Sequence, residues 1–234
     1  MTTARPLSLT RASRWWGFWV YAAVALVHVG GIVFAAEPIV YPTKLLLMPA
    51  LAMAAAVALR SRPRPPAARA RIAVVLLFLA ILFSWLGDGA SFFFPMLDDE
   101  LPAMLLSFGV AHLVYIWLFT RHLPINRVPV WTLVYGVWWG VMIAVLWPHL
   151  GVLLVPVMVY GIVLGGTALA STRGGFLTAI GGAFFLASDT ILALRLFLPD
   201  VSAELTGPWI MLTYTLGQGL LVYGIVRLVR ESRA

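Results

Sequence analysis

Two aspartates stand inside stretches that are otherwise typical of membrane spans. Asp88 lies in LFSWLGDGASFFF, and Asp189 lies in GAFFLASDTILALRLF. A carboxylate inside a bilayer costs several kcal/mol unless it faces protein or water, so such residues generally mark a functional site. Two carboxyl groups in one pocket can divide acid and base roles, as they do in glycoside hydrolysis. We therefore expect Asp88 and Asp189 to carry the chemistry of this chain.

Further polar side chains lie at similar depths in other apolar stretches. With a rise of 1.5 Å per residue, Asp88 would lie about 9 Å, Asp189 about 13 Å and His112 about 15 Å from the non-cytoplasmic surface. Residues three or four apart share one helix face, so several of these side chains pair on common faces and could line one polar pocket. The candidate catalytic residues are Asp88, Asp189 and His112, and the candidate substrate-binding residues are Lys44, Tyr115, Tyr214, Gln218, Ser84, Ser188 and Arg195.

A structural role is the alternative for these residues. Asp88 and Asp189 could each pair with a cation to fix the register of the helices, and His112 could simply hydrogen-bond another helix. The two candidate cations, Lys44 and Arg195, would lie near the membrane interface and could extend towards the headgroup layer. A lipid phosphate would lie at the same height.

Histidines and aspartates could also bind zinc. His28 and His112 both lie within spans, but neither HxxxH nor HExxH spacing is present. The chain contains no cysteine, which excludes thiolate ligands and disulfides. The sequence therefore predicts no metal site and no cofactor, and His28 is expected to be structural.

The composition predicts an integral membrane protein. Of 234 residues, 62% are hydrophobic and 11% are charged, whereas a soluble domain carries about 25% charged residues. The mean hydropathy is +0.97. A formal charge of +7 would suggest a nucleic-acid partner in a soluble protein, but here the basic residues cluster at the ends of the spans. We assign them to membrane topology and expect no nucleic-acid partner.

Apolar runs of about 18–24 residues predict an all-α bundle of eight transmembrane helices in a single integral membrane domain, residues 1–234. The first span has an apolar core of roughly 20 residues, longer than that of a signal peptide, so it is expected to stay as an anchor. Two spans meet at Pro148-His149 with almost no loop, which predicts a long kinked hairpin. The predicted spans lie near 15–36, 42–59, 71–94, 102–120, 128–147, 149–170, 175–198 and 207–229.

The segments between these spans alternate in charge. One set contains arginines, and the other contains acidic residues without Lys or Arg. By the positive-inside rule, both termini are predicted to be cytoplasmic, in a multi-pass protein of the cell membrane. The arginines are Arg5, Arg11, Arg14, Arg60, Arg62, Arg64, Arg69, Arg71, Arg121, Arg127, Arg173, Arg227, Arg230 and Arg233, and the acidic residues are Glu37, Asp98, Asp99, Glu100, Asp200 and Glu204.

The third and seventh spans resemble each other. FSWLGDGASFFFP in the third and FFLASDTILALRLFLP in the seventh would run in the same direction. This similarity could indicate two parallel four-helix halves with one aspartate each. Apolar helices rich in aromatic residues also resemble one another by composition alone, so both interpretations stay open.

Five segments resemble, in order and spacing, the YhhN-like lysoplasmalogenase family. They are YPTKLLLMP (41–49), FSWLGDGAS (83–91), FGVAHLVYIWLF (108–119), GGAFFLASDTILALRLF (181–197) and YTLGQGLL (214–221). The resemblance covers essentially all the predicted spans. It implies hydrolysis of the vinyl ether bond of lysoplasmalogens, which gives a fatty aldehyde and a glycerophospho-alcohol. The paired aspartates of the family match Asp88 and Asp189, and its Lys, His, Tyr and Gln positions match Lys44, His112, Tyr115 and Gln218.

The sequence departs from the family around the first aspartate. Trp85 and Gly89-Ala90 stand where family members often carry aliphatic residues, which leaves the preferred lipid chain open. The expected partners are a lysophospholipid substrate and the lipid bilayer, and the oligomeric state is not predicted.

Vinyl ether hydrolysis begins with protonation of an alkene carbon, so it needs one neutral carboxyl group and one ionised one. Asp189 stands in the more apolar segment and is expected to be the acid, with Asp88 as base or cation stabiliser. The two carboxyl groups should lie within about 10 Å of each other. The substrate should enter from the non-cytoplasmic leaflet, with its headgroup near Lys44 or Arg195. The rival hypothesis is a proton- or cation-coupled transporter that uses the same Asp and His residues.

Overall fold

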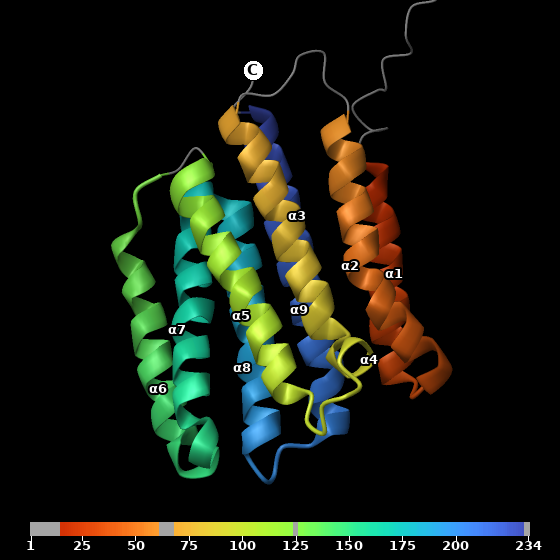
Figure 1. Ribbon diagram of the computed structural model, residues 1–234, viewed down its shortest axis with the longest axis vertical. Coiled ribbons are helices and arrows are strands. Elements are labelled where there is room, and N and C mark those ends of the chain that lie inside the picture. The colour runs from red at the N-terminus through yellow and green to blue at the C-terminus, as the bar shows by residue number, and fades with distance from the viewer. Residues whose placement is uncertain (1–14, 61–67, 124–125, 232–234) are drawn as a thin grey trace, which may run out of the picture.

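The computed structural model describes residues 15–60, 68–123 and 126–231, and this part of the chain is built from helices (Figure 1). Apolar runs form helices in a membrane because their backbone N–H and C=O groups must be satisfied internally. The short α4 (Ala90–Phe93) follows α3. The long helices are α1 (Trp16–Val33), α2 (Glu37–Arg60), α3 (Ala68–Asp88), α5 (Leu101–Trp117, continued by a π turn at Leu118–His122), α6 (Val134–Leu150), α7 (Leu154–Ser171), α8 (Phe176–Phe197) and α9 (Ala203–Glu231).

The described residues contain seven stretches that are long and apolar enough to cross a membrane. The longest, Val130–Gly174, folds back on itself as α6 and α7, so it supplies two of the predicted spans and confirms the predicted hairpin. The reversal occurs at Gly151, whose φ of 48° lies in the left-handed region that favours glycine. Pro148 lies inside the last turn of α6.

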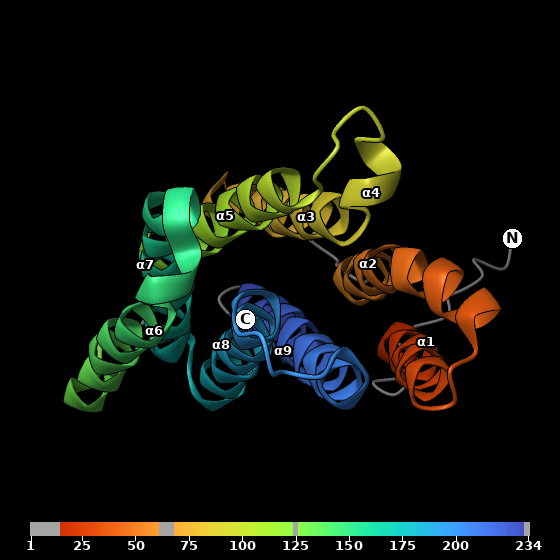
Figure 2. The same ribbon diagram turned by 90° about the horizontal axis from the view of Figure 1, so that it is seen from below.

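Seven of the long helices form a closed ring, seen end-on in Figure 2. Around the ring, α1 packs on α2, α2 on α3, α3 on α5, α5 on α7, α7 on α8, α8 on α9, and α9 on α1. The remaining helix, α6, lies outside the ring against α7 and α8. If the chain consisted of two equivalent halves, α1 and α6 would correspond, yet their neighbours differ. The division into two halves stays a prediction.

The most extensive contact between helices in the described part of the chain is made by α8 and α9. A Cβ atom on Gly217 would lie 2.7 Å from the backbone nitrogen of Phe185, and one on Gly181 would lie 2.7 Å from that of Leu221. Without side chains at these positions, the two backbones approach closely, which is how helices associate inside a membrane. This contact fixes the position of Asp189 on α8 relative to the polar residues of α9.

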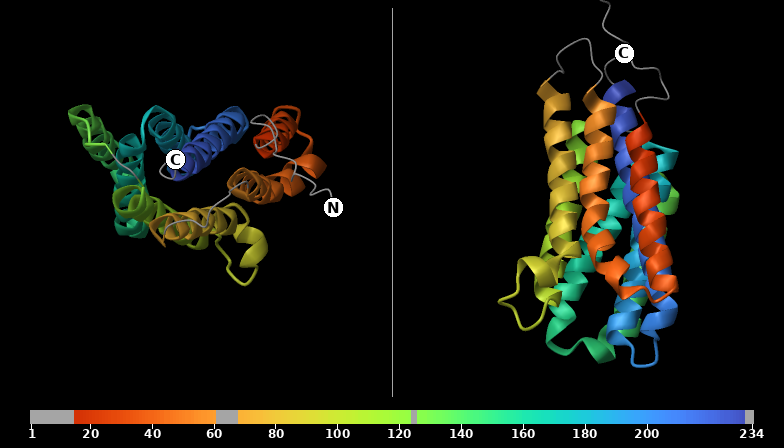
Figure 3. Two further views of the ribbon diagram at one scale, coloured as in Figure 1. Left: turned by 90° about the horizontal axis from the view of Figure 1, so that it is seen from above. Right: turned by 90° about the vertical axis from the view of Figure 1, so that its right-hand side faces the viewer.

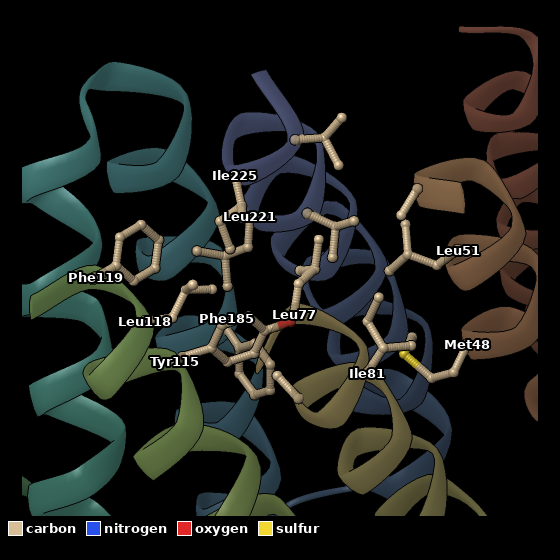
Figure 4. Close-up of a cluster of buried hydrophobic side chains, with 14 of the residues drawn as sticks. Met48, Leu51, Leu77, Ile81, Tyr115, Leu118, Phe119, Phe185, Leu221 and Ile225 are labelled. Carbon is tan, nitrogen blue, oxygen red and sulfur yellow. The ribbon is translucent and has the colours of Figure 1, made fainter. Parts of the chain in front are cut away.

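The middle of the ring is filled by apolar side chains from α2, α3, α5, α8 and α9 (Figure 4). Leu77, Tyr115, Phe185 and Leu221 are among the members and are almost completely buried. Many outward-facing side chains are also apolar, such as Trp19, which is 78% exposed. A protein with apolar residues on both its inner and its outer faces is suited to a lipid environment.

Several helix boundaries differ from the predicted spans, among them the start of α6 at Val134 rather than 128 and the start of α7 at Leu154 rather than 149. Helix α2 begins at Glu37, five residues before position 42, and Pro42 is accommodated inside it. Helix α3 ends at Asp88 rather than near 94, because the chain turns at Gly89 into α4. Helix α9 begins at Ala203 rather than 207 and runs through Pro208.

The start of α1 and the end of α9 lie at the same end of the bundle, together with the end of α2 and the start of α3 (Figures 1 and 3). The connections from α1 to α2, α4 to α5, α6 to α7, and α8 to α9 lie at the opposite end. Glu37, Asp98, Asp99, Glu100, Asp200 and Glu204 lie in or beside these connections. The charges are therefore separated along the length of the molecule. Which end faces the cytoplasm stays a prediction of the positive-inside rule.

Candidate active site

A cavity of about 480 Å³ opens between α1, α2, α3, α5, α8 and α9 at the acidic end of the ring. Asp99 and Glu100 from the segment before α5 form part of its wall. Both intramembrane aspartates line this one cavity, as the sequence predicted. The candidate residues that line it are Lys44, Asp88, Ser188, Asp189, Arg195 and Tyr214.

Asp88 is the last residue of α3 and is 8% exposed. Its Oδ2 accepts a hydrogen bond of 2.7 Å from the hydroxyl of Tyr214 on α9. A Cβ on the preceding residue, Gly87, would lie 2.6 Å from the ring of Phe108 on α5. Glycine beside the aspartate thus allows the close approach of a neighbouring helix. Asp88 is held between α3, α5 and α9.

Asp189 lies in the middle of α8, with its side chain 11% exposed. Its Oδ2 accepts a hydrogen bond from the hydroxyl of Tyr160 on α7. The Nε2 atom of His112 lies 3.9 Å from the same oxygen. Asp189 therefore has a tyrosine partner, as Asp88 does, and a histidine beside it in addition.

His112 is completely buried and is not among the residues that line the cavity. Its Nε2 lies 3.4 Å from the Tyr160 hydroxyl, and its Nδ1 lies 3.1 Å from Oγ1 of Thr167 on α7. The imidazole is therefore fixed between α5 and α7, on the far side of Asp189 from the cavity. It can influence Asp189, but it does not itself reach the cavity.

Three predicted substrate-binding residues also lie behind the cavity wall. The Tyr115 hydroxyl donates to Oε1 of Gln218 at 2.9 Å, and Nε2 of Gln218 donates to Oγ of Ser84 at 2.9 Å. All three side chains are completely buried. Contrary to the prediction that they face the pocket, they bond to one another and tie α3, α5 and α9 together. These hydrogen bonds satisfy polar groups that a membrane interior would otherwise leave unpaired.

The other predicted binding residues lie at the cavity. Ser188 donates its hydroxyl to the backbone carbonyl of Ile210 at 3.0 Å, so this group joins α8 to α9. Lys44 and Arg195 line the cavity, yet within the described chain neither forms an ion pair with Asp88 or Asp189. The pairing of these cations with the aspartates, which the structural alternative required, is therefore not found.

Tyr160 and Thr167 were not among the candidate residues predicted from the sequence, since none was assigned to the span near 149–170. A signal was available, since Tyr160 is a polar side chain in the middle of the apolar run VMVYGIVLGG rather than at its end. His28 also lines the cavity, but its Nδ1 lies 3.1 Å from the carbonyl of Val40 and 3.0 Å from Oγ1 of Thr43. These contacts involve one of its two ring nitrogens, and the structural role expected for His28 stays a prediction.

No group of three or more His, Asp or Glu side chains among the described residues is arranged to hold a metal ion. What the cavity offers is two carboxyl groups, each with a tyrosine donor, together with two cations and an acidic segment near its mouth. Such a set can transfer protons and bind a charged or zwitterionic ligand.

A family model described as the YhhN family matches residues 39–225. The matched region contains both aspartates and every other candidate residue of the site. No curated protein and no solved structure matches the chain.

Proposed function

Since this chain belongs to the YhhN family, we propose that it is a membrane hydrolase that cleaves the vinyl ether bond of lysoplasmalogen-type lysophospholipids. The products would be a fatty aldehyde and a glycerophospho-alcohol. The observation that carries the proposal is that Asp88 and Asp189 line one cavity between membrane-spanning helices, each with a tyrosine hydroxyl on its carboxyl group.

Two carboxyl groups suffice for the reaction. One donates its proton to the alkene carbon farther from the ether oxygen, which leaves an oxocarbenium ion. The other takes a proton from water as the water oxygen bonds to the cationic carbon. The hemiacetal so formed transfers its hydroxyl proton to the ether oxygen as that C–O bond breaks, which releases aldehyde and alcohol. The roles parallel those in glycoside hydrolysis, where the transition state is similar.

The other residues would bind and orient. Lys44 and Arg195 line the cavity and carry the positive charge that a lipid phosphate needs. His112 touches Asp189 from behind, so we propose it as a positioning residue that acts through Asp189. Tyr115, Gln218 and Ser84 would support the wall of the cavity without touching the substrate.

The transporter hypothesis has less support. A transport path must be able to open towards both ends of the molecule, whereas the apolar layer of Leu77, Tyr115, Phe185 and Leu221 fills the ring between the cavity and the basic end. Hydrolysis requires access from one side, which the cavity provides.

The test is aldehyde release by the purified protein in detergent micelles supplied with a lysoplasmalogen. We expect release by the parent protein and a loss of about 10²–10⁴-fold in both Asp88→Asn and Asp189→Asn, because general acid–base groups contribute this much. Asp200→Asn is the matched control, since Asp200 is exposed and does not line the cavity.

Near-normal aldehyde production by both cavity variants would disprove the carboxyl mechanism. Folding is checked by the thermal unfolding of each variant in the same detergent. An inactive parent protein that moves protons or cations across a sealed vesicle would favour the transporter, because transport needs a closed compartment and hydrolysis does not.

A further inference from the structure

The interior of the ring beyond the two aspartates has no room for a hydrocarbon chain. Leu77, Tyr115, Phe185 and Leu221 are each at most 1% exposed in the layer next to the cavity (Figure 4). Packed membrane-protein interiors, like other protein interiors, contain few voids. A chain attached to a vinyl ether at the aspartates therefore cannot continue along the axis of the ring. At the acidic end of the cavity, Asp99 and Glu100 form part of the wall and disfavour an apolar chain, so the chain is expected to leave sideways, through the wall of helices.

Two apolar grooves lie in that wall. One, of about 610 Å³, lies between α1 and α9, and the other, of about 560 Å³, lies between α5 and α7. The α5–α7 groove follows α5 from Pro102 to Leu113, which is about 16 Å of helix. Its walls include Leu106, Gly109 and Leu113 on α5 and Pro156, Val159 and Tyr160 on α7.

Tyr160 connects the α5–α7 groove to the candidate active site. The residue lines the groove, and its hydroxyl donates to Asp189, which lines the central cavity. Two tyrosines, Tyr21 and Tyr223, line the α1–α9 groove. Tyr21 donates to the backbone carbonyl of Thr215 at 2.7 Å, and within the described chain neither tyrosine hydrogen-bonds to an aspartate of the site. One side chain therefore separates the α5–α7 groove from a carboxyl group of the site.

We propose that the α5–α7 groove holds the hydrocarbon chain of the substrate while the reacting bond lies between Asp88 and Asp189. This inference rests on the proposed hydrolase function. The chain passes beside the Tyr160 ring, whose hydroxyl keeps its hydrogen bond to Asp189, and it stays at the boundary between protein and lipid. Gly109 leaves room opposite this ring, since a Cβ there would lie 4.0 Å from Cδ2 of Tyr160. The lipid therefore need not leave the bilayer entirely to react.

A pair of glycine substitutions tests the assignment by filling each groove in turn. Gly109→Leu fills the α5–α7 groove, and Gly30→Leu fills the α1–α9 groove, where a Cβ has no neighbour within 4 Å. Both positions tolerate a side chain without backbone overlap, so both variants should fold. We expect Gly109→Leu to lower kcat/KM for a long-chain lysoplasmalogen about tenfold relative to a short-chain analogue. Gly30→Leu should leave this ratio unchanged. A ratio that changes in Gly30→Leu alone, or in neither variant, would overturn the proposal.

A binding measurement separates this proposal from the hydrolase proposal. The probe is an alkyl-ether lysophospholipid, which cannot be cleaved by protonation of an alkene, with a photoactivatable diazirine in its chain. We expect the label on residues of α5 and α7 that line the groove, and we expect excess unlabelled lysolipid to displace it. Label that is displaced only from α1 and α9 overturns the chain site, whatever the activity. An inactive parent protein that is still labelled in the α5–α7 groove contradicts the hydrolase and retains the chain site.

Discussion

Each aspartate of the cavity is held by one tyrosine hydroxyl from another helix. Tyr214 reaches Asp88 from α9, and Tyr160 reaches Asp189 from α7. Hydrogen bonds to charged groups contribute roughly 1.5–3 kcal/mol each, more than those between neutral groups. The tyrosines therefore fix the direction in which each carboxyl group points, and the substrate meets carboxyl groups that are already oriented.

Tyr160→Phe should lower kcat about tenfold to a hundredfold, because it removes one such hydrogen bond from Asp189. KM should change less than kcat, since the phenol does not touch the headgroup end of the cavity. The comparison is Tyr135→Phe, because Tyr135 is buried in α6 and its hydroxyl forms no hydrogen bond within the described chain. Equal steady-state kinetics for the two variants would show that Asp189 needs no support from Tyr160.

The pH dependence of residual activity can assign the acid and the base. A general acid must be protonated, so its reaction is lost as pH rises, whereas a general base must be ionised, so its reaction is lost as pH falls. If Asp189 is the acid, Asp189→Asn should lose the alkaline limb of a bell-shaped profile of kcat/KM. Asp88→Asn should lose the acidic limb. The opposite pattern would exchange the two roles.

The sequence predicted some of these residues better than others, for a physical reason. Asp88 and Asp189 could be identified because a carboxylate in a membrane is costly wherever it points. Tyr160 gave a weaker signal, since a tyrosine is tolerated in an apolar span without a partner, and its partner is on another helix. Gln218 and Tyr115 were predicted to face the cavity, but they lie behind the residues that line it. The side that each residue faces depends on how its helix is rotated about its own axis.

Glycines position the aspartate-bearing helix α8 against α9. Gly181 and Gly217 lie at the contact, and the atoms nearest to their absent Cβ atoms belong to backbone, which cannot move aside as a flexible side chain can. The register between α8 and α9 is therefore set by main-chain contact. The hydroxyl of Ser188, bonded to the carbonyl of Ile210, reinforces it towards the cavity.

Gly217→Ala should destabilise the protein by about 1–3 kcal/mol, because the added methyl group would overlap the backbone of Phe185. The measurement is the midpoint of thermal unfolding in detergent. Gly136→Ala on α6 is the control, since a Cβ there has no neighbour within 4 Å. Its midpoint should be unchanged or slightly higher, because alanine favours helix. A fall of similar size in both variants would show that the close contact is not the cause.

Element boundaries were predictable where charge or proline stops an apolar run, and less so elsewhere. The span predicted near 175–198 is α8, Phe176–Phe197. The span predicted near 71–94 ends instead at Asp88, because hydropathy continues through ASFFF while the chain turns at Gly89. Hydropathy indicates whether a segment lies in an apolar environment, but it does not indicate where the chain changes direction.

At the scale of the whole molecule, the acidic connections lie at one end of the bundle, and most of the described loop arginines lie at the other. Lys44 and Arg195 are cations near the acidic end, and both line the cavity. The positive-inside rule concerns the loops, and there the arginines of the described part of the chain lie at the end that carries the start of α1 and the end of α9. Arg5, Arg11, Arg14, Arg62, Arg64 and Arg233 lie outside the described residues. That end should therefore be cytoplasmic, and the cavity should open towards the opposite leaflet.

Single cysteines can test this orientation, because the chain has none of its own. Met96→Cys places a thiol at the acidic end, and Asn126→Cys places one at the basic end. Both positions are exposed, and neither change alters the net charge. A membrane-impermeant maleimide applied to intact cells should label Met96→Cys, whereas Asn126→Cys should react only after the membrane is opened. The reverse pattern would invert the topology and move the cavity to the cytoplasmic leaflet.

The position of α6 outside the ring has a consequence for how the protein tolerates sequence change. Among the described helices, α6 makes its main contacts with α7 and α8, and it contributes no residue to the lining of the central cavity. Val137 and Val141 face outward, with more than half of their surfaces exposed. In a library of random substitutions selected for function, the outward positions of α6 should accept almost any apolar residue, whereas those of α8 and α9 that face the ring should accept few. Substitutions can therefore accumulate on the outward face of α6 during evolution. Through them the protein can gain contacts with other membrane proteins, while the residues of the cavity stay unchanged.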